Sequence, residues 1–366
     1  MSLKCGIVGL PNVGKSTLFN AISNAGAEAA NFLFCTIEPN VGVVTVPDPR
    51  LQALEKIVEP EKVVPTIIEF VDIAGLVQGA SKGEGLGNQF LANIREVDAI
   101  VHVTRCFDDD NIIHVDGEVG PVKDKDIIDT ELQLKDLETL EKRKTRIEKI
   151  AKSGDASAKK ELEVINQYIS YIEGGNNARG IELSEEDKEL VKILCLLTEK
   201  PVIYVANVGE DDLANNGNAH VEALKEAIKT ENAQIVLVSA SIESQIAELN
   251  DEEEKAEFLE EYGLKESGLD KLIQASYALL NLITYFTAGK TEVRAWTIEK
   301  GWKAPKAASV IHTDFEKGFI KAEVMKYQNF IELGSELACK EAGKLAIEGK
   351  EYVVEDGDIM HFRFNV

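Results

Sequence analysis

The chain has 366 residues, 44% hydrophobic and 28% charged, which is the composition of an ordinary globular protein with two or three domains. Its net charge of −24 argues against non-specific wrapping of nucleic acid and against a DNA partner. No apolar run is long enough to cross a bilayer, nothing near residue 1 resembles a signal peptide, and the five cysteines are scattered singly. We therefore expect a cytoplasmic protein with reduced thiols and no membrane partner.

The segment from Gly9 to Ser16 reads G-L-P-N-V-G-K-S and fits the phosphate-binding template G-x-x-x-x-G-K-[ST]. Its glycines let the backbone curl until its N–H groups point at phosphate oxygens, Lys15 reaches the β- and γ-phosphates, and Ser16 offers a hydroxyl to Mg²⁺. A strand over 3–9 precedes the motif, and a helix over 17–24 follows it and directs its N-terminus at the anion. This context favours a P-loop over an ordinary glycine turn.

The next segments resemble the switch regions of a P-loop protein. Thr36 stands on a loop just before a predicted strand, where a switch threonine closes on Mg²⁺ and the γ-phosphate; a surface threonine is the alternative. A strand over 64–72 ends in D-I-A-G, so Asp72 is predicted to hold Mg²⁺ through water and Gly75 to give its N–H to the γ-phosphate. The alternative for Asp72 is that it only caps a helix. Glycines at 79, 83, 85 and 87 favour a pliable, nucleotide-sensing loop.

The position after Gly75 holds Leu76, where many GTPases place a glutamine that orients water. Leucine cannot polarise water, so hydrolysis is expected to be slow unless another group positions the attacking molecule. His114, beyond the acidic loop F-D-D-D-N, is a candidate for that role, and a structural or solvent histidine is the alternative. His102 alternates with apolar residues along a strand over 99–106 and is predicted to be a satisfied structural histidine.

From residue 129 the pattern becomes helical. Apolar residues at steps of three and four on either side of a turn at 153–157 predict two antiparallel helices, a short coiled-coil hairpin. Six basic residues on the first arm are candidates for contact with RNA phosphate, or form a solvated face: Lys142, Arg143, Lys144, Arg146, Lys149 and Lys152. A capping box at Ser184 and Asp187 predicts a further helix reaching residue 199.

A buried strand over 201–206 runs into N-V-G-E at 207–210, where guanine-binding switches usually have N-K-x-D. Val208 replaces the lysine that packs on the base, and Glu210 replaces the aspartate that accepts two hydrogen bonds from guanine. A guanine site without that fit discriminates poorly, so we predict weakened guanine preference and an opening for adenine. A strand over 236–240 places Ser239 in the loop that closes over the base.

The last third of the chain carries no catalytic constellation that we recognise. An acidic stretch over 247–261 is predicted to be a solvated helical face, and a helix over 268–282 leads into a second domain. Short strands over 283–288, 291–298, 319–324, 349–354 and the final residues, with a helix from 329, predict a small α+β domain. His312 is predicted to be structural.

Taken together, G-L-P-N-V-G-K-S, F-C-T-I-E-P-N-V-G-V-V, D-I-A-G-L-V-x-G-A-x-x-G-E-G-L-G-N and N-V-G-E closely resemble the YchF, or Obg-like, ATPases, which are P-loop NTPases of the TRAFAC class. The resemblance runs over nearly the whole chain. It implies an α/β fold class with a Ras-like P-loop domain over 1–128 and 200–282 and an antiparallel coiled-coil insertion over 129–199. It also implies a ubiquitin-like β-grasp TGS domain over 283–366, whose signature resembles residues 301–324.

The resemblance further implies hydrolysis of ATP in preference to GTP, and ribosome binding at the large subunit or its RNA, linked to translation or stress. The residues that match the family's nucleotide contacts are Asn12, Val13, Gly14, Lys15, Ser16, Thr17, Asn207, Val208 and Glu210. Ser16 and Thr36 match its Mg²⁺ ligands, and Asn12 matches an asparagine that holds K⁺ in some relatives. His114 lies in a family segment, and Asn31-Phe32-Leu33 departs from the usual Tyr-Pro pair.

Two rival functions stay open at this point. One is a GTPase of the same fold. The other is a non-hydrolysing module in which bound nucleotide gates the binding of a partner. Leu76 is consistent with this alternative, because it replaces the glutamine that orients water.

Overall fold

The computed structural model describes residues 3–25, 40–73, 86–109, 111–112, 118–231, 233–249 and 251–365. Its first sheet has six strands, all parallel except β2, which runs antiparallel to β4. In spatial order these strands are β2 (Val41–Thr45), β4 (Ile67–Asp72), β1 (Leu3–Val8), β5 (Ala99–Arg105), β6 (Val202–Asn207) and β7 (Gln234–Val238).

Helices cover both faces of this sheet, so its central strands are buried on both sides and mostly apolar instead of alternating. Every residue of β5 and β6 is buried. The helices of this part are α1 (Lys15–Ala25), α3 (Leu86–Glu96), α7 (Glu210–Ala214), α8 (Ala219–Ala227), α9 (Ala240–Ile246), α10 (Glu252–Glu261) and α11 (Gly268–Leu279). The acidic stretch predicted as one helical face is therefore divided between the residues after α9 and α10.

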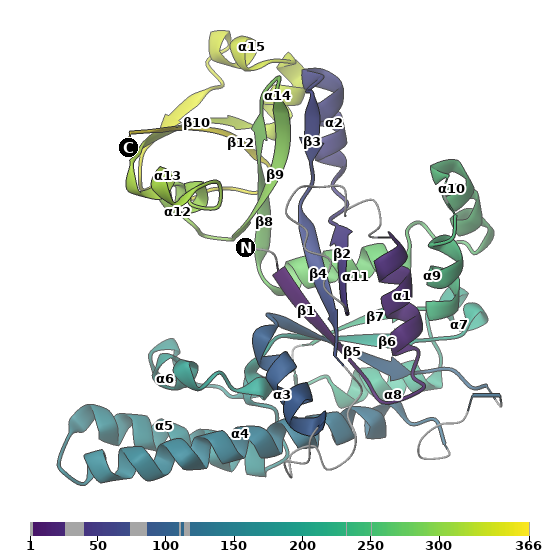
Figure 1. Cartoon of the computed structure of the whole chain (residues 1–366), viewed down its shortest axis with the longest axis vertical. Coiled ribbons are helices and arrows are strands. Elements are labelled where there is room, and N and C mark those ends of the chain that lie inside the picture. The colour runs from purple at the N-terminus through teal and green to yellow at the C-terminus, as the bar shows by residue number, and fades with distance from the viewer. Residues whose placement is uncertain are drawn as a thin grey trace.

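A helical hairpin projects away from the sheet (Figure 1). It consists of α4 (Pro121–Ala151) and α5 (Ala156–Glu173), and its core includes Leu140, Ile165 and Tyr168. The two helices confirm the predicted hairpin, although α4 begins at Pro121, well before the first residue that showed the periodicity. Three of the six basic residues over 142–152 pair with glutamates of the hairpin, namely Lys142 with Glu138, Arg143 with Glu161 and Lys144 with Glu141.

A buried cluster of charges fastens the base of the hairpin to the first sheet. The Lys125 ammonium on α4 lies 2.8 Å from Asp129 and 3.0 Å from Glu231. Glu231 also pairs with Arg179 at 2.9 Å and accepts a hydrogen bond from the Tyr204 hydroxyl on β6 at 3.0 Å. Burial alone lowers the pKa of Lys125, but the two carboxylates raise it by more, so the ammonium stays charged. The cluster thus joins α4, a 3₁₀ turn at Ala178–Gly180 and the segment after α8.

The prediction of a helix that reaches residue 199 is wrong, because the helix ends earlier. It ends as α6 (Glu185–Val191), continues as a 3₁₀ turn at Lys192–Leu194, and breaks at Cys195, whose φ is +48°. A second 3₁₀ turn follows at Leu197–Glu199. The buried Asp136 carboxylate on α4 accepts hydrogen bonds from the N–H groups of Leu197 and Thr198, at 2.7 and 2.8 Å, which takes the donors that a continuing helix needs.

The second sheet also has six strands, in the order β11 (Ala346–Glu348), β10 (Phe319–Lys326), β12 (Asp358–Phe364), β8 (Leu282–Ala288), β9 (Glu292–Glu299) and β3 (Lys62–Val64). Its helices are α12 (Ala304–Ala308), α13 (Thr313–Lys317), α14 (Tyr327–Leu333) and α15 (Glu336–Glu341). The predicted strand over 349–354 is wrong, because pairing with β10 stops at Glu348. Within 349–354 a single bridge joins Val353 to Lys303.

An early segment of the chain completes this second sheet. Strand β3 pairs with β9, and the preceding helix α2 (Pro49–Val58) packs Leu51 and Leu54 into a core with Phe286 and Ile359. Figure 1 shows α2 and β3 beside β9, far from the hairpin. We predicted no element over 49–58, and this segment lies by number within 1–128. The division into three domains at 128, 199 and 282 stays a prediction.

Two further observations concern the described residues. No helix among them is both long and apolar enough to span a bilayer. The four cysteines that the structure describes carry free thiols, buried at Cys5, Cys106 and Cys339 and exposed at Cys195.

Leu54→Ala tests how much the second sheet depends on α2. Leu54 is fully buried, so we expect the unfolding free energy to fall by about 2–5 kcal/mol from lost burial and the cavity left behind. Denaturant titration measures the change. Gln52→Ala, on the exposed side of the same helix, is the matched control and should change stability by less than about 0.5 kcal/mol. Equal effects in both variants would contradict the described packing.

Candidate functional site

The predicted phosphate-binding loop lies between the end of β1 and the start of α1. Gly14 has a φ of +94°, and a Cβ there would stand 2.1 Å from the Asn207 side-chain nitrogen. At Gly9 a Cβ would meet the Val103 carbonyl oxygen at 2.8 Å. Asn12 adopts a φ of +65°, a left-handed conformation that asparagine tolerates. Both glycines of the template are therefore required by the backbone and by its neighbours.

Asn207, at the end of β6, joins this loop to the loop after β7. Its side-chain nitrogen donates to the Val13 carbonyl at 2.9 Å, and its side-chain oxygen accepts from the Ala240 N–H at 3.0 Å. All three groups are buried, so each bond satisfies a polar group that is shielded from water. The predicted base-reading asparagine therefore also fixes the distance between the two loops.

The predicted phosphate and metal groups come together at the start of α1. The Lys15 ammonium forms an ion pair with the Asp72 carboxylate at the end of β4, and both side chains are mostly buried. Ser16 and Thr17 are exposed in the first turn of the same helix. The N-terminal N–H groups of α1 and the Lys15 charge favour an anion here, and the Ser16 hydroxyl and Asp72 carboxylate are hard oxygen donors that suit Mg²⁺.

The predicted base-reading residues lie at the ends of the neighbouring strands β6 and β7. Val208 is 2% exposed and packs in the core of the first sheet, while Glu210 is exposed at the start of α7. The Glu210 carboxylate accepts a hydrogen bond from the Ser241 hydroxyl at 2.9 Å. Ser239 is buried at the start of α9, in the loop after β7.

A buried carboxylate supports this loop from behind. Glu243 on α9 accepts hydrogen bonds from the N–H groups of Gly268 and Leu269, at 2.7 and 3.2 Å, and so caps the start of α11. Burial raises the pKa of Glu243 to about 7, although the two N–H donors act in the opposite direction. The sequence placed the S-A pair at 239–240 in this loop, but nothing in it marked Ser241 as a partner of Glu210 or Glu243 as the support of the loop.

Several predicted site positions lie outside the described residues. They are Thr36, Gly75, Leu76 and His114, together with the segment at 31–33 and the glycine loop from 79 to 85. Before the His114 segment, the buried Arg105 guanidinium donates to the carbonyls of Phe107, Asp109 and Ile112 at 2.8–3.1 Å.

His102 is buried on β5 as predicted, with its ring 5.3 Å from that of Tyr204. Burial lowers its pKa to about 4, so the imidazole is neutral near pH 7. The prediction of a satisfied histidine is wrong in one respect, because its Nε2 has no hydrogen-bond partner in the part of the chain that the structure describes.

Comparison with known proteins agrees with this geometry. A family model described as "50S ribosome-binding GTPase" matches residues 4–208, and the YchF-GTPase C-terminal model, described as a protein of unknown function (DUF933), matches residues 282–365. A Bacillus subtilis protein named "Ribosome-binding ATPase YchF" is 59% identical over the full length of both chains, and a Haemophilus influenzae protein of that name is 58% identical. The chain belongs to the YchF family. The resemblance drawn from the motifs is thereby confirmed.

Solved structures agree with this assignment to the YchF family. The structure of the Schizosaccharomyces pombe YchF GTPase superposes with a TM-score of 0.90 at 43% identity, covering 99% of this chain and 98% of that one. A GTP-binding protein from Pyrococcus horikoshii superposes with a TM-score of 0.61 at 19% identity, which shows a shared fold alone. The predicted α/β fold with a P-loop GTPase domain is confirmed, and the TGS assignment of the last part stays a prediction.

Asn207→Ala tests the link between the two loops of this YchF-family site. The change leaves the Val13 carbonyl and the Ala240 N–H without their partner, so we expect stability to fall by about 1–3 kcal/mol. We expect nucleotide affinity to fall by more than about tenfold, because the P-loop is no longer held in register. Calorimetry measures both quantities. Asn215→Ala, an exposed asparagine nearby, should leave both nearly unchanged; a similar loss there would contradict the assignment.

Glu243 gives the site a pH dependence. Its folded pKa, about 7, lies above the ordinary value of 4.5, so between these values the folded protein binds more protons than the unfolded chain. The unfolding free energy contributed by Glu243 therefore falls as the pH rises from about 4.5 through 7, by up to about 3 kcal/mol. Glu243→Gln removes the titration. The unfolding free energy of wild type minus that of this variant should fall from pH 5 to pH 8, and a pH-independent difference would refute the assignment.

Proposed function

We propose that the protein is a ribosome-associated ATPase that hydrolyses ATP, and GTP less well, to ADP and phosphate, and acts as a nucleotide-dependent switch. The observation that carries this proposal is the Asn207 bridge, which couples a P-loop to a base motif that lacks the lysine and aspartate of guanine readers. Nucleotide hydrolysis by a P-loop domain is common to the family, whereas the preference for ATP is our inference for this chain.

The proposed chemistry is phosphoryl transfer to water, which depends mainly on positioning and charge stabilisation. Lys15 neutralises charge on the β- and γ-phosphates. To do so, its ammonium breaks the ion pair with Asp72 and pairs with phosphate oxygens instead. The freed Asp72 carboxylate, through water, and the Ser16 hydroxyl are the described groups that would hold Mg²⁺, which neutralises charge on the phosphates when bound. N–H groups at the start of α1 direct the phosphates.

Four further residues enter the proposal from the sequence and from the family resemblance. Thr36 would complete the Mg²⁺ ligands, Gly75 would donate its N–H to the γ-phosphate, and His114 would position the attacking water in place of the glutamine that Leu76 replaces. Asn12, at the exposed end of the P-loop, is the candidate for contact with K⁺.

Preference for adenine follows from the residues at the base site. Glu210 is one methylene longer than aspartate and already accepts from Ser241, and Val208 is buried in the core. Neither reproduces the pairing that selects guanine. The bacterial relatives are named ATPases, whereas the fission yeast protein is described as a GTPase, so the choice of base requires direct measurement.

The proposed partner is the ribosome, at the large subunit or its RNA, which places the protein in the cytoplasm. Support comes from the names of the full-length relatives and from the "50S" in the description of the matching family model. The net charge of −24 restricts any RNA contact to local basic surfaces. Towards the hairpin tip, Arg146 and Lys149 on α4 and Lys152 just after it are exposed, and we assign these residues to such a contact.

Competition binding of ATP against GTP tests the base site. We expect wild type to bind ATP more tightly, and Glu210→Asp to shift the ratio towards GTP by about three- to tenfold, because the shorter carboxylate suits the guanine edge. Glu222→Asp, a surface change on α8, is the control and should leave the ratio alone. Tighter binding of GTP by wild type would overturn the preference for ATP, while the assignment of the P-loop would still stand.

Single-turnover hydrolysis, measured with and without ribosomes, separates the switch from its rivals. Slow cleavage of ATP, accelerated by ribosomes and abolished in Lys15→Ala, is the result that supports the proposal. Binding without turnover in either condition would leave a nucleotide-gated binding module instead of an enzyme.

A further inference from the structure

The second sheet brings three potential metal ligands together, far from the P-loop. Glu323 on β10 and His361 on β12 stand directly opposite each other in the antiparallel pair. Glu336, in the first turn of α15, joins them. One ligand atom from each of these three side chains lies within 4.8 Å of the other two.

The two faces of the sheet explain why these side chains converge. Along β10 and β12, Ala322, Val324 and Phe362 point into the core beneath α12 and α13. The alternate positions face the other way, where Met325 and Ile359 pack in the core that α14 and α15 adjoin. Glu323 and His361 belong to this second face, and α15 passes over its end. The geometry is therefore set by strand register and by a packed helix.

From this convergence we propose that Glu323, Glu336 and His361 form a binding site for a divalent transition-metal ion, with Zn²⁺ as the best match. Two carboxylates and one imidazole are ligands that zinc accepts, and the imidazole selects against Mg²⁺ and Ca²⁺, which take oxygen ligands. This site is independent of the proposed nucleotide hydrolysis.

The distances are compatible with one ion after small side-chain rotations. Zinc bonds of about 2.0–2.2 Å in a tetrahedron place ligand atoms about 3.4 Å apart, so atoms that now lie within 4.8 Å of one another must approach by up to about 1.4 Å. Glu336 and His361 are exposed and can rotate at little cost, while Glu323 is half-buried and sets the position. Three protein ligands leave a fourth position for water.

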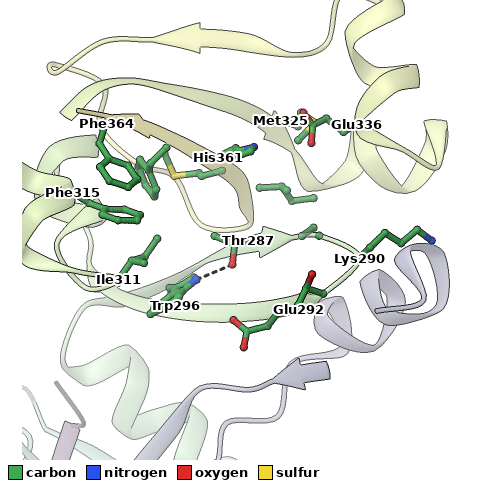
Figure 2. Close-up of a pocket in the computed structure, with 16 residues that line it drawn as sticks. Thr287, Lys290, Glu292, Trp296, Ile311, Phe315, Met325, Glu336, His361 and Phe364 are labelled. Carbon is green, nitrogen blue, oxygen red and sulfur yellow. Dashed lines mark hydrogen bonds between the residues drawn. The ribbon is translucent and has the colours of Figure 1, made fainter. Parts of the chain in front are cut away.

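The open side of the triad faces a cavity of about 440 Å³. Glu336 and His361 line it together with Trp296, Phe315 and Phe364, and Figure 2 shows the two ligands on one side of the cavity and the two phenylalanines on the other. The Phe315 and Phe364 rings stack at 3.7 Å between centroids. The fourth position of a bound ion is thus reachable from solvent through a preformed hollow.

Two cations already contact Glu323 and compete with a metal. Arg363 donates to its Oε2 at 2.9 Å, and Lys321 lies 3.6 Å from Oε1. The Arg363 side chain is about half exposed, so giving up this ion pair costs little.

Zinc titration of the full chain, with excess Mg²⁺ to fill sites of hard oxygen donors, tests the proposal. Calorimetry gives the affinity, and NMR of the histidine rings reports the position. We expect the His361 resonances to shift and those of His312 to stay. Affinity should fall at least tenfold in His361→Asn and in Glu336→Gln, both surface changes that leave folding intact. His312→Asn is the matched control, because His312 is an exposed histidine 3.2 Å from a single carboxylate, that of Asp314.

Three outcomes overturn the site. They are the absence of zinc binding, equal affinity in His361→Asn and wild type, and binding that shifts another histidine while His361 stays still. A thiolate charge-transfer band with Co²⁺ would assign the ion to cysteine instead, and so would also count against the triad. None of these outcomes bears on nucleotide hydrolysis, so failure here and failure of the proposed function are distinguishable.

Discussion

The amide of Asn207 holds together two loops that are 194 and 33 residues away from it in the chain. Its nitrogen keeps the Val13 carbonyl in place, and its oxygen keeps the Ala240 N–H, so the phosphate end and the base end of the site share one support. Gly14 depends on the same group, because any side chain there would collide with it. The spacing of this site is therefore set by a buried polar side chain between two strand ends, where parallel α/β sheets place their ligands.

Most of what the sequence predicted correctly was local. The P-loop follows from eight consecutive residues, the strands β1, β5 and β6 from short apolar runs, and the hairpin from a repeat of three and four. The features that the sequence did not predict depend on contacts between distant parts of the chain. Helix α2 and strand β3 owe their place to partners more than 200 residues away, and the break after α6 depends on Asp136 in another helix. In the sequence alone Glu243 looks like a surface acid, because its partner, the N–H of Gly268 at the start of α11, is 25 residues away.

Ion pairs in this protein stand where separate parts of the chain meet. The buried cluster of Lys125, Asp129 and Glu231 lies between the hairpin and the first sheet, whereas Arg50 on α2 reaches the half-exposed Asp356 beside the second sheet at 2.7 Å. A buried ion pair adds little net stability over an apolar contact, but losing one partner is costly, and an exposed pair contributes little either way. The buried cluster therefore favours one docking geometry of the hairpin over its neighbours, and nucleotide-dependent changes near Asp72 would meet a stiff connection on that side.

The position of α2 and β3 has a consequence for dissection of the chain. The C-terminal family model begins at residue 282, yet the sheet that it describes is completed by β3, at residues 62–64. A fragment starting at 282 would lose the outer partner of β9 and the helix that covers Phe286, leaving an unpaired edge and a bare apolar surface, both of which promote aggregation. The sequence boundary is thus not an autonomous folding boundary, and an isolated C-terminal piece would be a poor substitute for the intact protein in binding studies.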